Sequence, residues 1–418
     1  MTVLRTPDGM QAVNVTLVCG TRAEAAYFSI FPKATGATES AIGQIPQVGN
    51  LPTGEKIFSG VFPGVRPGDL YGHRVSGPWD PDKGDTYNAH KVVFPLLAAA
   101  ASHTIQVPPL TGPKADSRPY AFALGDRSQR EMSEVDSGPW VPKGVVVDHE
   151  TDGSGGSSGE RRVLRAGRLT ATGRPVPTAI LELNPRTLTS ALGRQLAMTG
   201  IRPGTLRAMG TPAVISYLAT LGFPDLEFMP TFISANERHL KRPNIWGYNN
   251  FGIAIDPQLI DDSRGPQYGP VEFRRLLRDL EVWGMGVYAD VAPAHTAEGD
   301  FSGISLSLKL LGNREAYRLH PGNPKKYLDF SGCLNAVDTS SGLGGYYVFN
   351  GLRLLAQWYP LIGVPPGPGI DRGKERKGRL RPEPRVLPAA GAGSGAFAHG
   401  LHLRAARRTC ARSSGRGP

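Results

Sequence analysis

The sequence predicts a multidomain protein with an N-terminal β-sandwich, a partial (β/α)8 barrel (the TIM barrel) and a disordered basic tail. Three observations predict this order. Short apolar runs separated by Pro and Gly fill residues 1–148, strand and helix patterns alternate over residues 178–363, and residues 364–418 are dense in Pro, Gly and Arg. Many short strands are typical of sandwiches, and strand–helix alternation is typical of parallel βαβ units.

The first segment shows the two-residue periodicity of half-buried strands. Apolar and polar residues alternate in VNVTLVC, and the other runs are rich in aromatic and β-branched residues. We expect strands at 13–19, 26–31, 56–62 and 70–75. Turn residues between these runs favour a sandwich, which we assign to residues 1–148.

Residues 149–177 interrupt this pattern with the run GSGGSSG at 153–159, followed by an Arg-rich stretch. Gly/Ser-rich segments form flexible linkers, so we predict a linker or an insertion without chemistry of its own.

Residues 178–363 alternate between strand and helix patterns, which predicts the first part of a (β/α)8 barrel. The helix at 271–283 is amphipathic, because Phe273, Leu276, Leu277 and Leu280 share one face. We expect strands at 179–183, 223–229 and 286–291, and helices at 212–221, 271–283 and 350–359. No fourth strand is predicted after the last helix.

The tail holds most of the charge. Residues 364–418 contain 12 Lys and Arg against 3 Asp and Glu, so they carry nine of the eleven net positive charges of the chain. A composition rich in Pro, Gly and Arg predicts disorder. Binding of nucleic acid through this tail is the disfavoured alternative, since a solvated tail explains the same composition.

The N-terminal sequence and the cysteines indicate the cellular compartment and argue against a metal cofactor. The N-terminus has no apolar run long enough for a signal peptide or a membrane span, so we expect a cytoplasmic protein that does not bind membranes. The three cysteines are Cys19, Cys333 and Cys410, without CxxC pairs or nearby histidines. This pattern argues against a disulfide framework and a zinc site, and we assign no metal ligands.

The segment 71–88, YGHRVSGPWDPDKGDTYN, carries the most specific motif. It resembles the Y-G-Y-R-V-x-G-P-[WY]-x-P-x-x-G-x-[RY]-[FY]-N segment of bacterial glycogen debranching enzymes and isoamylases, glycoside hydrolases of the α-amylase clan. The resemblance implies that the sandwich is a starch-binding-type module. We interpret Tyr71 and Trp79 as buried anchors of this connection.

The barrel segments resemble the same family. ILELNPRTLT at 180–189 is similar to its first barrel strand, although Pro185 replaces an apolar residue and would disturb a central strand. The segment 317–338 resembles Y-Y-R-L…Y-x-x-x-T-G-C-G-N-x-x-D, which points to debranching enzymes rather than to ordinary amylases.

Two loops supply the predicted substrate-binding residues, Trp246, Tyr248, Asp290 and His295. IWGYN at 245–249 matches a Y-W-G-Y-N loop, and this match implies that Tyr248 stacks on the glucose at the cleavage point. DVAPAHT at 290–296 is similar to D-V-V-Y-N-H-T at the end of the third strand, where barrels place chemistry. The match implies that Asp290 orients an active-site Arg and that His295 hydrogen-bonds the sugar.

The catalytic carboxylates of the family have no counterpart, so we assign no catalytic residue. Retaining glycosidases need two carboxyl groups about 5–5.5 Å apart. In the family the nucleophile is the last Asp of D-G-x-R-x-D on the fourth strand, whereas here Val364 is followed by PPGPGID. Asp371 lies near that place but stands among Pro, Gly and Lys, and we do not assign it the role. We hypothesise a frameshift near codon 364, which a second reading frame encoding D-G-x-R-x-D would support.

The resemblance implies a glycogen-debranching hydrolase of α-1,6 branch linkages in glycogen, amylopectin or limit dextrin. We expect little or no hydrolysis by this chain. The alternative is a non-catalytic α-glucan-binding protein that uses the sandwich. Within the enzyme class, a trehalose-releasing or an isoamylase-like specificity stays open. Hydrolysis in this family uses water and carboxylates, so no cofactor is implied.

Overall fold

The computed structural model describes residues 2–5, 11–105, 131–149, 179–236, 244–261, 263 and 265–364, which all fall within one compact unit. The predicted linker at 149–177, apart from its first residue, and the predicted disorder of the tail after Val364 lie outside the described residues.

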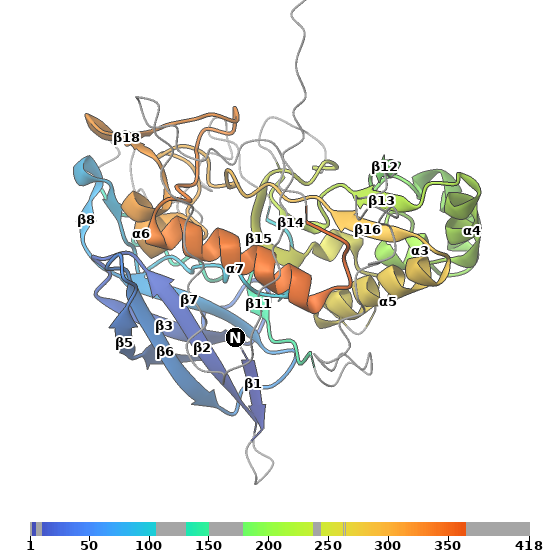
Figure 1. The fold of residues 1–418 in the computed structure, drawn as a ribbon. Coiled ribbons are helices and arrows are strands. Elements are labelled where there is room, and N and C mark those ends of the chain that lie inside the picture. Colours follow the sequence, from blue (N-terminus) through green and yellow to red (C-terminus); the bar gives the residue numbers. More distant parts are fainter. Residues whose placement is uncertain are drawn as a thin grey trace, which may run out of the picture. The chain divides into compact units, whose positions relative to one another are not determined.

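Two sheets form the N-terminal half, as the sequence predicts. The first sheet is antiparallel, with the order β1 (Thr2–Arg5), β2 (Gln11–Cys19), β6 (Lys56–Pro63) and β5 (Gln47–Asn50). The second contains β3 (Ala25–Phe31), β4 (Ala41–Ile45) and β7 (Leu70–Ser76). All four predicted strands are present (Figure 1).

Aromatic side chains join the two sheets. The ring of Phe28 in β3 lies 4.8 Å from that of Phe62 in β6 and 5.8 Å from that of Tyr71 in β7. Tyr71 is buried, as expected for an anchor, and Trp79 is half-buried and packs against the same core. Burial of these rings supplies much of the apolar area that stabilises a sandwich.

The second sheet continues into the C-terminal half of the chain, which the sequence did not predict. Its order is β14-β15-β10-β11-β7-β3-β4, where β14 is Phe232–Ser234, β15 is Asn250–Ile255, β10 is Ala100–Ala101 and β11 is Gly144–Val145. Ala100 of β10 pairs in parallel with Ile255 of β15. The β14–β15 hairpin is therefore part of the sandwich sheet.

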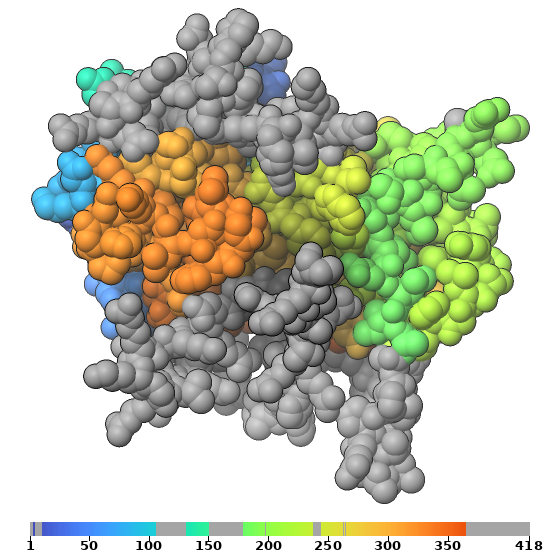
Figure 2. All heavy atoms as spheres, turned by 90° about the horizontal axis from the view of Figure 1, so that it is seen from above, coloured from blue at the N-terminus to red at the C-terminus, as the bar shows by residue number. Residues whose placement is uncertain are grey.

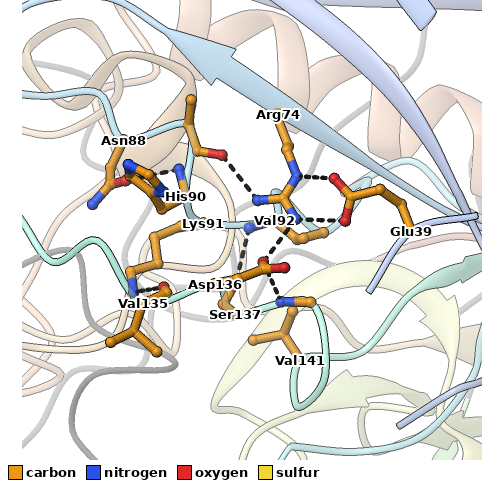
Figure 3. Close-up of polar contacts among 12 residues, drawn as sticks. Glu39, Arg74, Asn88, His90, Lys91, Val92, Val135, Asp136, Ser137 and Val141 are labelled. Atoms are coloured by element: carbon orange, nitrogen blue, oxygen red, sulfur yellow. Dashed lines mark hydrogen bonds and ion pairs between the residues drawn. The ribbon is translucent and has the colours of Figure 1, made fainter. Parts of the chain in front are cut away.

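Polar side chains fasten residues 131–145 to the sandwich, as Figure 3 shows for most of them. Arg74 donates to Glu39 (Nε–Oε1 2.8 Å) and to Asp136 (Nη2–Oδ1 2.7 Å). The buried Lys91 ammonium donates to Ser133 Oγ at 2.9 Å, and that of Lys143 donates to backbone carbonyls. Burial lowers the pKa of Lys91 to about 7 and that of Lys143 to about 8, because desolvation disfavours the charged ammonium.

Three parallel strands form the predicted barrel portion: β12 (Ile180–Leu183), β13 (Asp225–Phe228) and β16 (Gly286–Ala289). Leu183, Phe228 and Ala289 stand in register and face the helices. These helices are α3 (Leu206–Met209), α4 (Pro212–Thr220) and α5 (Gly269–Val282). β12 ends before Pro185, so that proline lies in the turn after the strand and does not disturb it, contrary to expectation.

Among the described residues the parallel sheet has three strands, and the segment after the last helix joins it through an isolated bridge. After α7 (Gly342–Trp358) the chain returns to β16, where Ile362 N donates to Val287 O at 2.8 Å and Ala289 N to Gly363 O at 3.2 Å. Tyr288 and Gly363 form a parallel bridge. This contact is an isolated bridge outside the strands of the sheet, and the residues after Val364 lie outside the described part of the chain.

The remaining elements are short. They are β8 (Trp79–Asp80), η1 (Pro81–Lys83), β9 (Asp85–Thr86), η3 (Ser190–Leu192), α2 (Gly193–Ala197), η4 (Pro257–Leu259), η5 (Pro266–Tyr268), α6 (Leu308–Ala316), β17 (Leu319–His320) and β18 (Asn323–Tyr327). Among the described residues, no helix has both the length and the apolarity that a membrane crossing requires.

Candidate functional site

Three of the four predicted residues meet at the end of the parallel sheet. Asp290 directly follows β16, and Tyr248 lies in the β14–β15 hairpin loop. The Tyr248 hydroxyl donates to Asp290 Oδ2 at 2.5 Å, and His295 Nε2 donates to the Tyr248 carbonyl at 2.9 Å. The hairpin of the sandwich sheet and the loop after β16 thus build one cluster, which we call the Tyr248 cluster: Tyr248, Asp290 and His295.

Burial sets the protonation of this cluster. Burial raises the pKa of Asp290, although the hydrogen bonds that it accepts from the Tyr248 hydroxyl and the Val291 amide act in the opposite direction. Burial also raises the pKa of Tyr248, and the hydrogen bond to Asp290 and its negative charge add to this rise. Burial also lowers the pKa of His295. The hydrogen bond to the Tyr248 carbonyl and the charge of Asp329 act in the opposite direction, because both favour the charged imidazolium. A neutral imidazole that donates through Nε2 has an acceptor at Nδ1, and this buried atom has no partner among the described residues.

Trp246 lies in the same loop but outside the cluster. Its side chain is 57% exposed. The Asn244 Oδ1 atom accepts from the amides of Trp246 and Gly247, both at 3.1 Å, which fixes the turn. Gly247 has φ +81°, and a Cβ there would lie 2.7 Å from Pro230 O, so only glycine fits. The loop therefore holds the Trp246 ring toward solvent.

Sequence reasoning missed Arg186, which joins the ends of three strands. Its Nη2 donates to Asp256 Oδ2 at 2.6 Å, and its Nη1 donates to Pro230 O at 2.5 Å. Both the guanidinium and the Asp256 carboxylate are buried. The charge within the run ILELNPRTLT was the available signal, because a buried strand end that carries Arg needs a carboxylate partner.

A second missed group, Glu298, holds the loop after His295. Its carboxylate accepts from the amides of Leu306 (2.7 Å), Ser307 (2.9 Å) and Lys309 (3.1 Å) and from the Tyr317 hydroxyl (2.5 Å). Glu298 is fully buried, so these bonds replace its hydration. The only signal in the sequence was its place two residues after the DVAPAHT segment at 290–296.

Solved structures with a similar fold include pullulanases. The pullulanase of Paenibacillus barengoltzii in complex with maltohexaose and α-cyclodextrin aligns over 87% of this chain and 48% of its own, with a TM-score of 0.57 and 14% identity. The Group B Streptococcus pullulanase in complex with maltotetraose aligns over 87% of this chain and 41% of its own, with a TM-score of 0.59 and 16% identity. The fold is that of multidomain pullulanases, with a β-rich N-terminal region.

Sequence similarity is more specific. The glycogen debranching enzyme of Klebsiella pneumoniae subsp. pneumoniae is 32% identical over 288 residues, which are 68% of this chain and 39% of the relative. That of Serratia proteamaculans is 31% identical over 300 residues, 71% of this chain and 41% of the relative. The chain is therefore homologous to glycogen debranching enzymes of the α-amylase clan, and it spans about two fifths of their length. No protein-family model matches it.

Proposed function

We propose that the chain is the α-glucan-binding portion of a glycogen-debranching-type glycoside hydrolase, a class that cleaves α-1,6 branch linkages of glycogen and related glucans. The observation that carries this proposal is the Tyr248 cluster at the carboxyl end of β16. The similarity to glycogen debranching enzymes supports the same assignment. Glycogen, amylopectin and limit dextrin are the proposed partners.

The chemistry of the cluster suits a sugar ring. The Tyr248 ring offers an apolar face, while Asp290 offers carboxylate oxygens that accept from hydroxyl donors. The hydrogen bond from His295 Nε2 to the Tyr248 carbonyl holds Tyr248 in place beside Asp290. Binding without a metal or an organic cofactor is therefore proposed.

Hydrolysis is not proposed for these 418 residues. Retention of configuration needs a nucleophile and an acid about 5–5.5 Å apart. The D-G-x-R-x-D motif is absent from these residues, and Asp290 accepts a hydrogen bond from the Tyr248 hydroxyl. The second candidate function is a non-catalytic α-glucan-binding protein. A cytoplasmic location stays a prediction.

Affinity electrophoresis in gels that contain glycogen tests glucan binding, and a parallel reducing-sugar assay tests the lack of hydrolysis. We expect retardation of the wild-type chain without release of reducing ends. Retardation should weaken in Tyr248→Ala and persist in Tyr217→Ala, a change on the exposed face of α4. Absence of retardation would refute glucan binding, and release of reducing ends would refute the proposed lack of hydrolysis.

A further inference from the structure

The loop between β18 and α7 presents two apolar side chains to solvent within five residues. Phe330 is 59% exposed and Leu334 is 55% exposed. Single exposed apolar residues are common on protein surfaces, whereas two on one short loop make that loop a candidate contact surface. We call Phe330 and Leu334 the apolar loop pair.

The backbone holds this pair rigidly. Asp329 Oδ1 accepts from the amides of Ser331 (3.0 Å) and Gly332 (2.9 Å), and its Oδ2 accepts from that of Leu334 (3.0 Å). Leu334 has φ +69°, and among the described residues no other residue except glycine has a positive φ. The debranching-enzyme pattern T-G-C-G-N has glycine at this position. Backbone strain of this kind concentrates at functional sites.

The loop is attached to the Tyr248 cluster. Asn335 accepts from the Thr296 amide at 3.0 Å and donates to the Thr296 carbonyl at 2.9 Å, directly beside His295. The Asp329 charge acts on the His295 imidazole. In Figure 2 the orange surface of the chain after residue 300 lies beside the yellow-green surface of the chain around residue 250, on one face.

Polar groups flank the aromatic ring. The Arg318 guanidinium carbon lies 6.0 Å from the centroid of the Phe330 ring, and its Nε lies 3.7 Å from Asp338 Oδ1. The cation restrains the ring from one side. An aromatic ring with a charged donor over one face and a carboxylate nearby has the composition of a sugar-binding surface, where the ring contacts C–H groups and the polar groups contact hydroxyls.

We propose that the apolar loop pair is a second contact surface for α-glucan, which binds glucose units adjacent to the one held by the Tyr248 cluster. The inference rests on the proposed function, since it extends the same site along the chain of the polysaccharide. The pair would therefore select for long α-glucans over short ones, because a short ligand occupies the Tyr248 cluster alone.

Isothermal titration of the full chain with maltohexaose and with maltose tests this proposal. Phe330→Leu removes the flat ring and keeps an apolar side chain, whereas Phe330→Trp keeps an aromatic ring at this position. The control Tyr217→Leu removes a ring of similar exposure (56%) from α4. Phe330→Leu should weaken maltohexaose binding by roughly tenfold, the loss expected for one aromatic contact. Maltose binding should stay unchanged, Phe330→Trp should recover the affinity, and Tyr217→Leu should have no effect.

The outcomes separate the two proposals. If the wild-type chain binds neither sugar, or if Tyr248→Ala binds both as well as the wild type, the proposed function fails. If Tyr248→Ala loses affinity and Phe330→Leu binds maltohexaose as the wild type does, only the second contact surface is refuted. An equal loss for maltose and maltohexaose in Phe330→Leu would also refute it, because a general structural defect acts on both ligands.

Discussion

Leu334 tests whether the left-handed backbone of the Asp329–Leu334 loop is as strained as φ +69° implies. A left-handed conformation costs an L-residue about 1–2 kcal/mol, whereas glycine adopts it freely but loses about 0.5–1 kcal/mol more backbone entropy on folding. Leu334→Gly should therefore be more stable than Leu334→Ala by about 0.5–1 kcal/mol. The comparison with alanine removes the side-chain contribution, since both variants lack the leucine side chain.

Met198 is the matched control. It is 90% exposed and has φ −64°, so the ordinary order applies and glycine should be less stable than alanine by about 0.5–1 kcal/mol. Urea unfolding at 25 °C measures each difference in unfolding free energy as the shift of the urea midpoint, provided that the variants share the same dependence of that free energy on urea concentration. If glycine is less stable than alanine at position 334 as well, Leu334 is not strained and the loop geometry described above is wrong.

Three further predictions concern the framework of the site. Gly247→Ala should destabilise the chain by about 1–3 kcal/mol and weaken glycogen retardation, because its Cβ would lie 2.7 Å from Pro230 O; unchanged unfolding would contradict this packing. Glu298→Ala should lower the free energy of unfolding in urea by about 3 kcal/mol or more, because the buried donors to its carboxylate lose their acceptor. The same change at the exposed Glu134 should have almost no effect. Similar losses in both variants would contradict the buried network. The pKa of Lys143 is about 8 in the folded chain and about 10.4 in an unfolded one, so the unfolded state binds more protons between these values and the unfolding free energy should rise with pH there. Lys143→Met should lose that part of the rise, and an unchanged pH slope would contradict the low pKa.

Most of the regular elements were predictable because their side chains repeat with a fixed period. β2, β3, β6 and β7 follow two-residue alternation, and α5 follows the helical period with Phe273 on its buried face. The short strands were not predictable. β10 and β11 have two residues each, and their place in the sheet is set by pairing with β15 and β7, which local sequence does not encode.

The candidate site was predictable from motifs, not from physics alone. Tyr248 lies 42 residues before Asp290 and 47 before His295, and only the resemblance to debranching enzymes brought the two loops together before the structure did. Trp246 was predicted beside them but points to solvent. The buried partner of Arg186 could not be predicted, since Asp256 belongs to another strand end and the pairing depends on tertiary packing.

The central claim is that the Tyr248 cluster binds α-glucan, and His295→Ala tests it most directly. This change removes the buried hydrogen bond from His295 Nε2 to the Tyr248 carbonyl, which positions the Tyr248 ring. Isothermal titration with maltohexaose should show a loss of about tenfold or more in affinity, the order expected when one buried hydrogen bond is lost. Tyr217→Ala should bind as the wild type does. Equal affinity of His295→Ala and the wild-type chain would contradict the claim.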